Sequence, residues 1–477
     1  MDINSFPFTM SLPVGLLGVL LLYYALRPRA QLLLLIVASL VFYAWLDGWF
    51  VLLAVAIAAG TFVTGLFIGA SDEAGRRRWL IAGVLFNVGV LVIFKYLGLL
   101  VASGDWLLRL LRTDSTLPLL QWGPRLAISF MVFNALSYLF DLWSGRSEPI
   151  CDCVTFVLFI CYFPHLVAGP ILRTKDLLPQ LGHPRVVTGD MIISGLLLMG
   201  FGLYKKLVLA DQMIPHVERV FEHADAMPWS TLLRGAWLFA LQLYADFSGY
   251  TDIARGCSRL FGIELPENFR WPLLATSVRD FWQRWHMTLS TWWRDYLYIP
   301  LGGSRRGGWM TCRNVMITMI IAGLWHGAEW TFVLWGALHG LLLVVGRLWR
   351  SWRPAAGTKA LHGAAWAGAV LGTFVVLTPT WVLFRAKSIG VAADYLRGLC
   401  TLRGGLDAFA LSDVALVVAF GGLVLLTDWL KQPDEVAAPP SSSTWPTYGR
   451  GILMGLLAVH FILAREDREA AFIYARF

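Results

Sequence analysis

His326 is an ionisable side chain inside an otherwise lipid-like stretch of the chain. The apolar run opens near residue 315, so His326 lies about eleven residues in, roughly 16 Å along a helix and near the middle of a ~30 Å hydrocarbon core. Ionisable groups at that depth are costly and by default mark chemistry or transport. An imidazole titrates near neutral pH, so the chemistry that it suits is proton transfer. We therefore predict a functional role for His326, against the alternative of a neutral histidine hydrogen-bonded between helices.

The other histidines in apolar surroundings fit packing better than function. They are His339, His362 and His460. Glu329 follows His326 by three residues, so on a continuous helix the two side chains would share a face. On that face Glu329 would either orient the imidazole or close a cavity beside it.

Residues 279–296 combine aromatic and charged side chains at helical spacing. The aromatic and apolar members recur at three- and four-residue steps: Phe281, Trp285, Leu289, Trp292 and Tyr296. This spacing predicts one continuous helix with an aromatic face and a charged face that carries Arg284 and Arg294. Such a helix either lies at the membrane interface, anchored by its tryptophans, or lines a substrate site. His286 flanks the aromatic stripe and slightly favours the second interpretation.

Positive charge is concentrated between residues 251 and 313, where nine arginines and five acidic residues leave +4 of the net charge of +8. Within this segment, the loop LGGSRRGG (residues 301–308) would hold phosphate through its backbone N–H groups and through Arg305 and Arg306. A nucleotide-bearing donor needs such a site. The total charge is modest for 477 residues, and no basic tail exists, which argues against a nucleic-acid platform.

The composition predicts an all-α polytopic membrane protein. Hydrophobic residues make up 57% of the chain and charged residues 15%, with a mean hydropathy of +0.62. No segment alternates polar and apolar residues, so helices are favoured over a barrel. We expect about eleven spans. The predicted spans lie near residues 8–26, 31–48, 50–70, 79–103, 119–141, 191–210, 231–250, 315–346, 364–384, 410–430 and 450–464.

Loop arginines recur after every second span, which predicts cytoplasmic loops there and an N-terminus facing outward. Residues 105–112 break this pattern and are interpreted as a short helix along the outer surface. Lys205 and Lys206 form a second, unexplained exception. The prolines in residues 163–173 predict a re-entrant element, and residues 432–449 read as a flexible loop before the last span. Six cysteines without paired spacing indicate neither a disulfide framework nor a metal site.

Motifs along nearly the whole chain resemble those of the membrane-bound O-acyltransferase family, MBOAT, most closely its bacterial alginate O-acetyltransferase branch. The matching segments include FKY (94–96), FPHLVAGP (163–170), DFSGY (246–250), ENF (267–269), FWQRWH (281–286), LGG (301–303), GLWHG (323–327) and WGALHG (335–340).

The resemblance implies a single membrane domain over residues 1–477, with an MBOAT core at 128–346 and a helical shell around a central tunnel. It implies that His326 is the catalytic residue and His286 its polar partner. It further implies acetyl transfer from cytoplasmic acetyl-CoA as a donor substrate, with no bound cofactor or metal. We expect the donor to contact six residues: Arg284, Arg294, Arg305, Arg306, Trp285 and Trp325.

The expected acceptor is a polysaccharide hydroxyl or a periplasmic SGNH-type partner, since no stretch outside the spans is long enough to fold as a soluble domain that completes the transfer. Polysaccharide-export proteins are further expected partners, and the expected location is the bacterial inner membrane. Two alternatives stay open. A D-alanyl transferase of the same superfamily would share His326 but use a carrier-protein thioester. A proton-coupled secondary transporter would use the same histidines, although the sequence lacks an inverted repeat.

Overall fold

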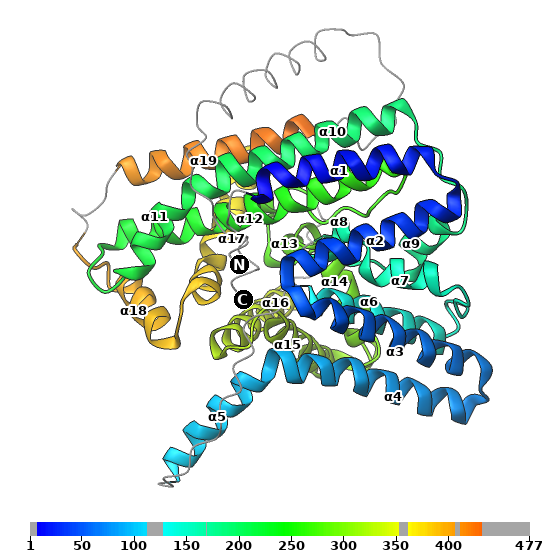
Figure 1. Ribbon diagram of the computed structural model, residues 1–477. Helices are drawn as coiled ribbons and strands as arrows, with labels where there is room; N and C mark the ends of the chain where they lie inside the picture. The colour runs from blue at the N-terminus through cyan, green and yellow to red at the C-terminus, as the bar shows by residue number, and fades with distance from the viewer. Residues whose placement is uncertain (1–6, 112–126, 168, 353–360, 406–410, 432–477) are drawn as a thin grey trace.

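The computed structural model describes residues 7–111, 127–167, 169–352, 361–405 and 411–431 (Figure 1). These residues form helices joined by turns, with no strand in the ranges given, so the predicted all-α class is confirmed. The N-terminal helices are α1 (Pro7–Ala25), α2 (Pro28–Asp47), η1 (Gly48–Phe50), α3 (Val51–Ala70), α4 (Glu73–Leu91), η2 (Val92–Tyr96) and α5 (Leu97–Leu110). The central helices are α6 (Ile128–Trp143), α7 (Cys153–Cys161), α8 (Phe163–Leu166), α9 (Thr174–Leu181), α10 (Gly189–Leu203), η3 (Tyr204–Ala210), α11 (Asp211–Glu222) and α12 (Trp229–Leu260). The remaining helices are η4 (Pro272–Leu274), α13 (Val278–Arg284), α14 (Met287–Trp293), η5 (Arg294–Tyr298), α15 (Gly307–His326), α16 (Trp330–Trp352), α17 (Gly363–Arg385), α18 (Ile389–Cys400) and α19 (Leu411–Lys431).

Six helical segments of the described chain are long and apolar enough to cross a membrane, so this is a multi-pass membrane protein. They are Pro28–Ala70, Glu73–Leu110, Gly189–Glu222, Trp330–Trp352, Gly363–Arg385 and Leu411–Lys431. Shorter apolar helices coincide with two further predicted spans, at Gly15–Ala25 and Ile128–Trp143. A third, Cys153–Leu166, lies where no span was predicted. The count of about eleven spans stays a prediction, because the expected span at 450–464 and the loop at 432–449 lie outside the described residues.

Two expectations about single segments are wrong. The predicted surface helix at 105–112 is, as far as Leu110, the end of α5, which continues α4 through η2 and projects from the body of the protein (Figure 1). The apolar run 315–346 is not one span but the helical pair α15 and α16. Glu329 lies exposed in the turn between them, so the helical spacing assumed for it and His326 does not exist. Hydropathy misses this turn because it contains the apolar Gly327 and Ala328.

The predicted continuous helix over residues 279–296 is also wrong. Helix α13 ends at Arg284 and α14 begins at Met287, with two non-helical residues between them. The five side chains of the aromatic stripe are all buried, yet the break divides them between two hydrophobic cores. Phe281 and Trp285 pack with α11, α12 and α17, whereas the later three pack with α1–α3, α6 and α7. The break therefore lies where the two cores meet.

The proline-containing segment after α7 is buried and only briefly helical. After α8, residues 169–173 are buried without regular structure. Their backbone N–H groups find side-chain partners, with Ile171 donating to Thr288 at 3.0 Å and Leu172 donating to Asn134 at 3.2 Å. Irregular backbone inside a membrane protein is tolerated where protein groups replace the lost helix bonds. The prolines thus interrupt the helix as expected, and membrane re-entry stays a prediction.

Helices α15 and α16 pack backbone against backbone. A Cβ added to Gly323 would lie 2.2 Å from the carbonyl oxygen of Phe332 and 3.1 Å from the backbone of Gly336. A Cβ on Gly336 would lie 2.2 Å from the carbonyl oxygen of Met319. Small residues of this kind allow membrane helices to approach closely. This contact holds the end of α15, and with it His326, against α16.

We expect Gly323→Ala to destabilise the protein, because the new methyl group meets backbone atoms that cannot rotate away. Overpacking of this kind costs about 1–3 kcal/mol. The matched control is Gly308→Ala in the same helix, where an added Cβ meets nothing within 4 Å. Thermal unfolding in detergent should show a lower midpoint for Gly323→Ala and little change for Gly308→Ala. Equal midpoints for the two variants would contradict the close packing.

A buried ion-pair network joins η3, α12 and α19. The side chain of Lys205 is 0% exposed, and its Nζ lies 3.1 Å from an oxygen of Asp252 and 2.6 Å from an oxygen of Asp428. Lys431 pairs with the other oxygen of Asp252 at 2.7 Å, and the Tyr244 hydroxyl donates to Asp428. Buried charges persist only when paired and hydrogen-bonded. The network therefore cross-links three helical segments that are far apart in the sequence.

The neighbouring Lys206 is paired in the same way. Its Nζ lies 2.9 Å from an oxygen of Asp211 and 2.9 Å from an oxygen of Asp246. These contacts explain why Lys205 and Lys206 do not follow the pattern of the loop arginines. Both lysines are interior ion-pair partners, so they carry no information about which loops face the cytoplasm.

Candidate active site

His326 is the last residue of α15 and lies among aromatic rings. The residue is 4% exposed. Its ring centroid lies 4.9 Å from those of Trp325 and Trp335 and 5.3 Å from that of Phe384. We call these three rings the aromatic cage. They approach the imidazole edge to face, at interplanar angles of 71° to 78°, so the cage fixes the orientation of the imidazole by packing.

His286 lies at the break between α13 and α14 and has a left-handed backbone, with φ 41° and ψ 56°. Positive φ is uncommon for residues with a Cβ and persists where the surroundings over-determine it, often at functional sites. Asn268 supplies much of that constraint. Its carbonyl oxygen accepts from the Met287 N–H at 2.9 Å, and its side-chain oxygen accepts from the Thr288 hydroxyl at 2.6 Å. His286 itself is 0% exposed and lies 4.7 Å from the ring of Phe247.

Trp325 connects the two histidines. Its ring centroid lies 4.9 Å from that of His326 and 6.2 Å from that of His286. Among the described residues, neither ring nitrogen of His286 has a hydrogen-bond partner, and neither do the indole N–H groups of Trp325 and Trp335. A buried polar group left without a partner costs about 1–3 kcal/mol. These groups are therefore suited to receive a polar substrate.

His339 is a third histidine in the same cluster. It is 0% exposed, and its ring lies 4.6 Å from that of Trp335. The Trp282 indole N–H donates to its Nδ1 at 3.3 Å, which leaves Nε2 as the nitrogen that carries the proton in the neutral ring. The sequence indicated only a packing role for His339. Its position four residues after Trp335, on the same face of α16, is the signal that places it here.

The predicted donor-binding residues fall into an interior group and an outer group. Trp285 and Trp325 are 4% and 3% exposed and lie beside the histidines. Arg284 and Arg294 each pair with a nearby aspartate, at 2.7 and 2.6 Å, with side chains 34% and 59% exposed. The turn that carries Arg305 and Arg306 is exposed. The structure thus brings Trp325 to His326 and Trp285 next to His286, and it keeps the arginines nearer the surface.

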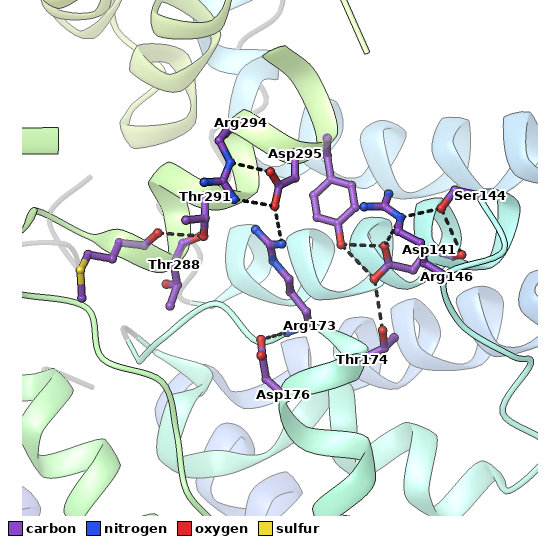
Figure 2. A network of polar contacts seen from close by, with 12 residues as sticks. Asp141, Ser144, Arg146, Arg173, Thr174, Asp176, Thr288, Thr291, Arg294 and Asp295 are labelled. Carbon is purple, nitrogen blue, oxygen red and sulfur yellow. Dashed lines mark hydrogen bonds and ion pairs between the residues drawn. The ribbon is translucent and has the colours of Figure 1, made fainter. Parts of the chain in front are cut away.

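A polar network holds η5, the helix that carries Arg294, in place (Figure 2). Asp295 accepts hydrogen bonds from Arg294 and, at 2.6 Å, from Arg173. Burial raises the pKa of Asp295, but the hydrogen bonds from the two arginines outweigh burial and hold that pKa below its usual range. Next to it, the Tyr296 hydroxyl donates to Asp141 of α6 at 2.9 Å. The network therefore fastens η5, which carries Arg294, to α6 and to the loop before α9.

A pocket lies between η4, α13 and α17, near the aromatic residues but not at His326. Phe281, Leu377 and Trp381 are among the side chains that line it. The Phe281 ring stacks on Trp285 at 5.4 Å, and Trp285 precedes His286. Phe281 therefore connects the pocket to His286 through Trp285. The lining of this pocket does not include His326. The predicted central tunnel stays a prediction.

These features define a class of protein. This is a multi-pass helical membrane protein with buried histidines and buried indole N–H groups that have no partner among the described residues. Histidines can transfer protons and N–H groups can stabilise developing negative charge, so these groups are typical of an intramembrane group-transfer enzyme. A model of the family MBOAT, the membrane-bound O-acyltransferases, matches residues 37–384. The chain belongs to the MBOAT family and is an O-acyltransferase.

The chain is similar to several bacterial acyltransferases. It is 39% identical over 376 residues to a probable alginate O-acetylase, AlgI, of Azotobacter vinelandii, covering 78% of this chain and 73% of the relative. It is 34% identical over 428 residues to a peptidoglycan O-acetyltransferase of Helicobacter pylori, covering 82% and 78%. It is 27% identical over 282 residues to a teichoic acid D-alanyltransferase of Streptococcus thermophilus, covering 54% and 67%. The resemblance inferred from the motifs is confirmed.

Proposed function

We propose that the protein transfers acetyl groups from cytoplasmic acetyl-CoA to an exported glycan of the alginate type, directly or through a periplasmic partner of the SGNH type. The observation that carries the proposal is the cluster of His286, Trp325 and His326 inside the region that matches the family. The acetyl group is favoured because the relatives with wide coverage are named as O-acetylases or O-acetyltransferases. We place the protein in the inner membrane with its N-terminus in the periplasm, in line with the loop arginines.

In the proposed mechanism, the acceptor hydroxyl oxygen attacks the carbonyl carbon of the thioester while His326 takes the hydroxyl proton. The carbonyl oxygen gains negative charge, which the indole N–H groups of Trp325 and Trp335 or a ring N–H of His286 stabilise. The carbon–sulfur bond then breaks, and the leaving thiolate receives the proton from His326. The imidazole returns to its neutral form, and the products are an acetyl ester and free CoA.

The donor would reach from the arginines to the histidines along α14 and η5. Arg294 follows His286 by eight positions, roughly 12 Å at helical rise. An extended pantetheine arm is long enough for this distance, so phosphates held at Arg284, Arg294, Arg305 and Arg306 leave the thioester near Trp325. Because His326 is 4% exposed, both substrates reach it only when rings of the aromatic cage move.

The test uses the purified full-length protein with acetyl-CoA labelled in the acetyl group. We expect label to appear on glycan or on the periplasmic partner, and no transfer when labelled D-alanine on a carrier protein replaces acetyl-CoA. Transfer from the alanyl carrier alone would replace the proposed donor with that of the D-alanyl branch. Proton-coupled uptake of a solute without transfer of label would favour the transporter.

Arginine variants in the same assay test how the donor binds. Arg305→Ala and Arg306→Ala should raise the KM for acetyl-CoA several-fold, and the effect should shrink at high salt, since exposed charge contacts are screened. Arg109→Ala is the matched control, because Arg109 is also exposed but lies on the projecting α5. An unchanged KM would contradict donor binding by Arg305 and Arg306, whose charges would then serve only to fix the orientation of the protein in the membrane.

A further inference from the structure

The end of α15 presents carbonyl groups to the protein interior. The last four carbonyls of an α-helix have no partner within the helix, and a buried helix end needs other donors. In α15, the Gly323 carbonyl oxygen accepts from the Gly327 N–H at 3.5 Å. The next two carbonyl oxygens, of Leu324 and Trp325, accept hydrogen bonds from side chains of another helix. Because His326 follows them directly, whatever holds these carbonyls also holds the imidazole.

Helix η2 supplies the donors. The Tyr96 hydroxyl donates to the Leu324 carbonyl oxygen at 3.0 Å, and the Lys95 ammonium donates to the Trp325 carbonyl oxygen. Two consecutive residues therefore satisfy two consecutive carbonyls. Helix η2 is a π-helical turn between α4 and α5, and π-helical turns of this kind occur frequently at functional sites. Lys95 also donates to the Ser129 hydroxyl at 3.2 Å, which ties the same ammonium to the start of α6.

Lys95 contacts residue 325 on its side chain as well as on its backbone. Its Nζ lies 5.7 Å from the centroid of the Trp325 ring, a distance at which an ammonium is attracted to an indole. A cation at a helix C-terminus is stabilised by the partial negative charge of the free carbonyls. Lys95 is thus bound at the one turn that carries both Trp325 and His326.

We propose that Lys95 is a positioning residue for acyl transfer. By holding the Trp325 carbonyl and ring together, it sets the placement of the His326 imidazole and the Trp325 indole N–H relative to the substrate. Without the ammonium, the Trp325 carbonyl loses its partner and the last turn of α15 loosens. A displacement of about 1 Å at a reacting group costs about 100-fold in rate. This inference rests on the proposed role of His326.

The experiment compares Lys95→Arg, Lys95→Gln and Lys95→Met in the purified full-length protein with labelled acetyl-CoA. Arginine keeps charge and donors, glutamine keeps an N–H donor without charge, and methionine keeps only the length. We expect kcat to fall in the order Arg, Gln, Met, with about a 100-fold loss for methionine. The KM for acetyl-CoA should stay within about twofold, because Lys95 acts on the placement of His326 and not on donor binding.

Two comparisons separate positioning from other causes. If Lys95→Met does not give a single symmetric peak in size-exclusion chromatography, the Arg and Gln variants decide the order by themselves. A glutamine variant as slow as methionine in folded protein, a loss confined to KM, or full activity of Lys95→Met would overturn the proposal. His326→Ala in the same assay is the test of the underlying mechanism: activity in that variant defeats the proposed function, whereas activity in Lys95→Met alone defeats only the positioning role.

Discussion

His326→Ala is expected to abolish acyl transfer while leaving the protein folded. General acid–base catalysis by a positioned side chain contributes about 100-fold to 10,000-fold, and alanine supplies no group that can take the hydroxyl proton. The residue stands at the end of α15, so the helix contacts between Gly323 and Gly336 remain. Label transfer from acetyl-CoA measures the loss, and size-exclusion chromatography in detergent measures the fold.

His362→Ala is the matched control for that variant. His362 precedes α17 and is exposed, so its loss should leave transfer unchanged. His326→Gln adds a further comparison, since an amide keeps hydrogen-bonding groups of similar reach but does not titrate near neutral pH. We expect the glutamine variant to be inactive as well. Turnover in either His326 variant would remove this residue from the chemistry.

Lys205→Met should cause the largest loss of stability. The substitution leaves Asp428 with the Tyr244 hydroxyl and without its cation, although Asp252 keeps Lys431. Removing one partner of a buried ion pair costs about 3–5 kcal/mol, because an uncompensated charge stays behind. The midpoint of thermal unfolding in detergent should fall accordingly, and α19 should become the first helix cut by protease, because the network is what ties it to η3 and α12.

An exposed lysine provides the comparison for this variant. Lys387 is 74% exposed at its side chain and lies 3.8 Å from Glu222, a surface pair worth about 0–1 kcal/mol. Lys387→Met should therefore hardly change the midpoint. The double variant Lys205→Met with Asp428→Asn should recover part of the loss, since it removes the stranded charge. A midpoint like that of the unsubstituted protein for Lys205→Met would mean that the network contributes no stability.

The class of the fold and the importance of His326 follow from local features of the sequence. Hydropathy is a sum over neighbouring residues, so it predicts an all-α membrane protein without knowledge of any long-range contact. An imidazole in apolar surroundings is conspicuous for the same reason. The motifs that contain His286 and His326 also resemble motifs of one family, so the sequence alone links the two residues.

Only the tertiary structure decided the helix breaks that no proline marks, and which charges pair. The break at His286 depends on Asn268, which holds Met287 and Thr288 from outside the helix. Lys205 meets Asp428 across 223 residues of sequence. Spacing along one helix carries no information about such partners, because the free energy that fixes them comes from burial and from hydrogen bonds formed when distant segments pack together. For that reason the sequence pointed to the histidines, while the arrangement of rings and donors around them came from the packing of the helices.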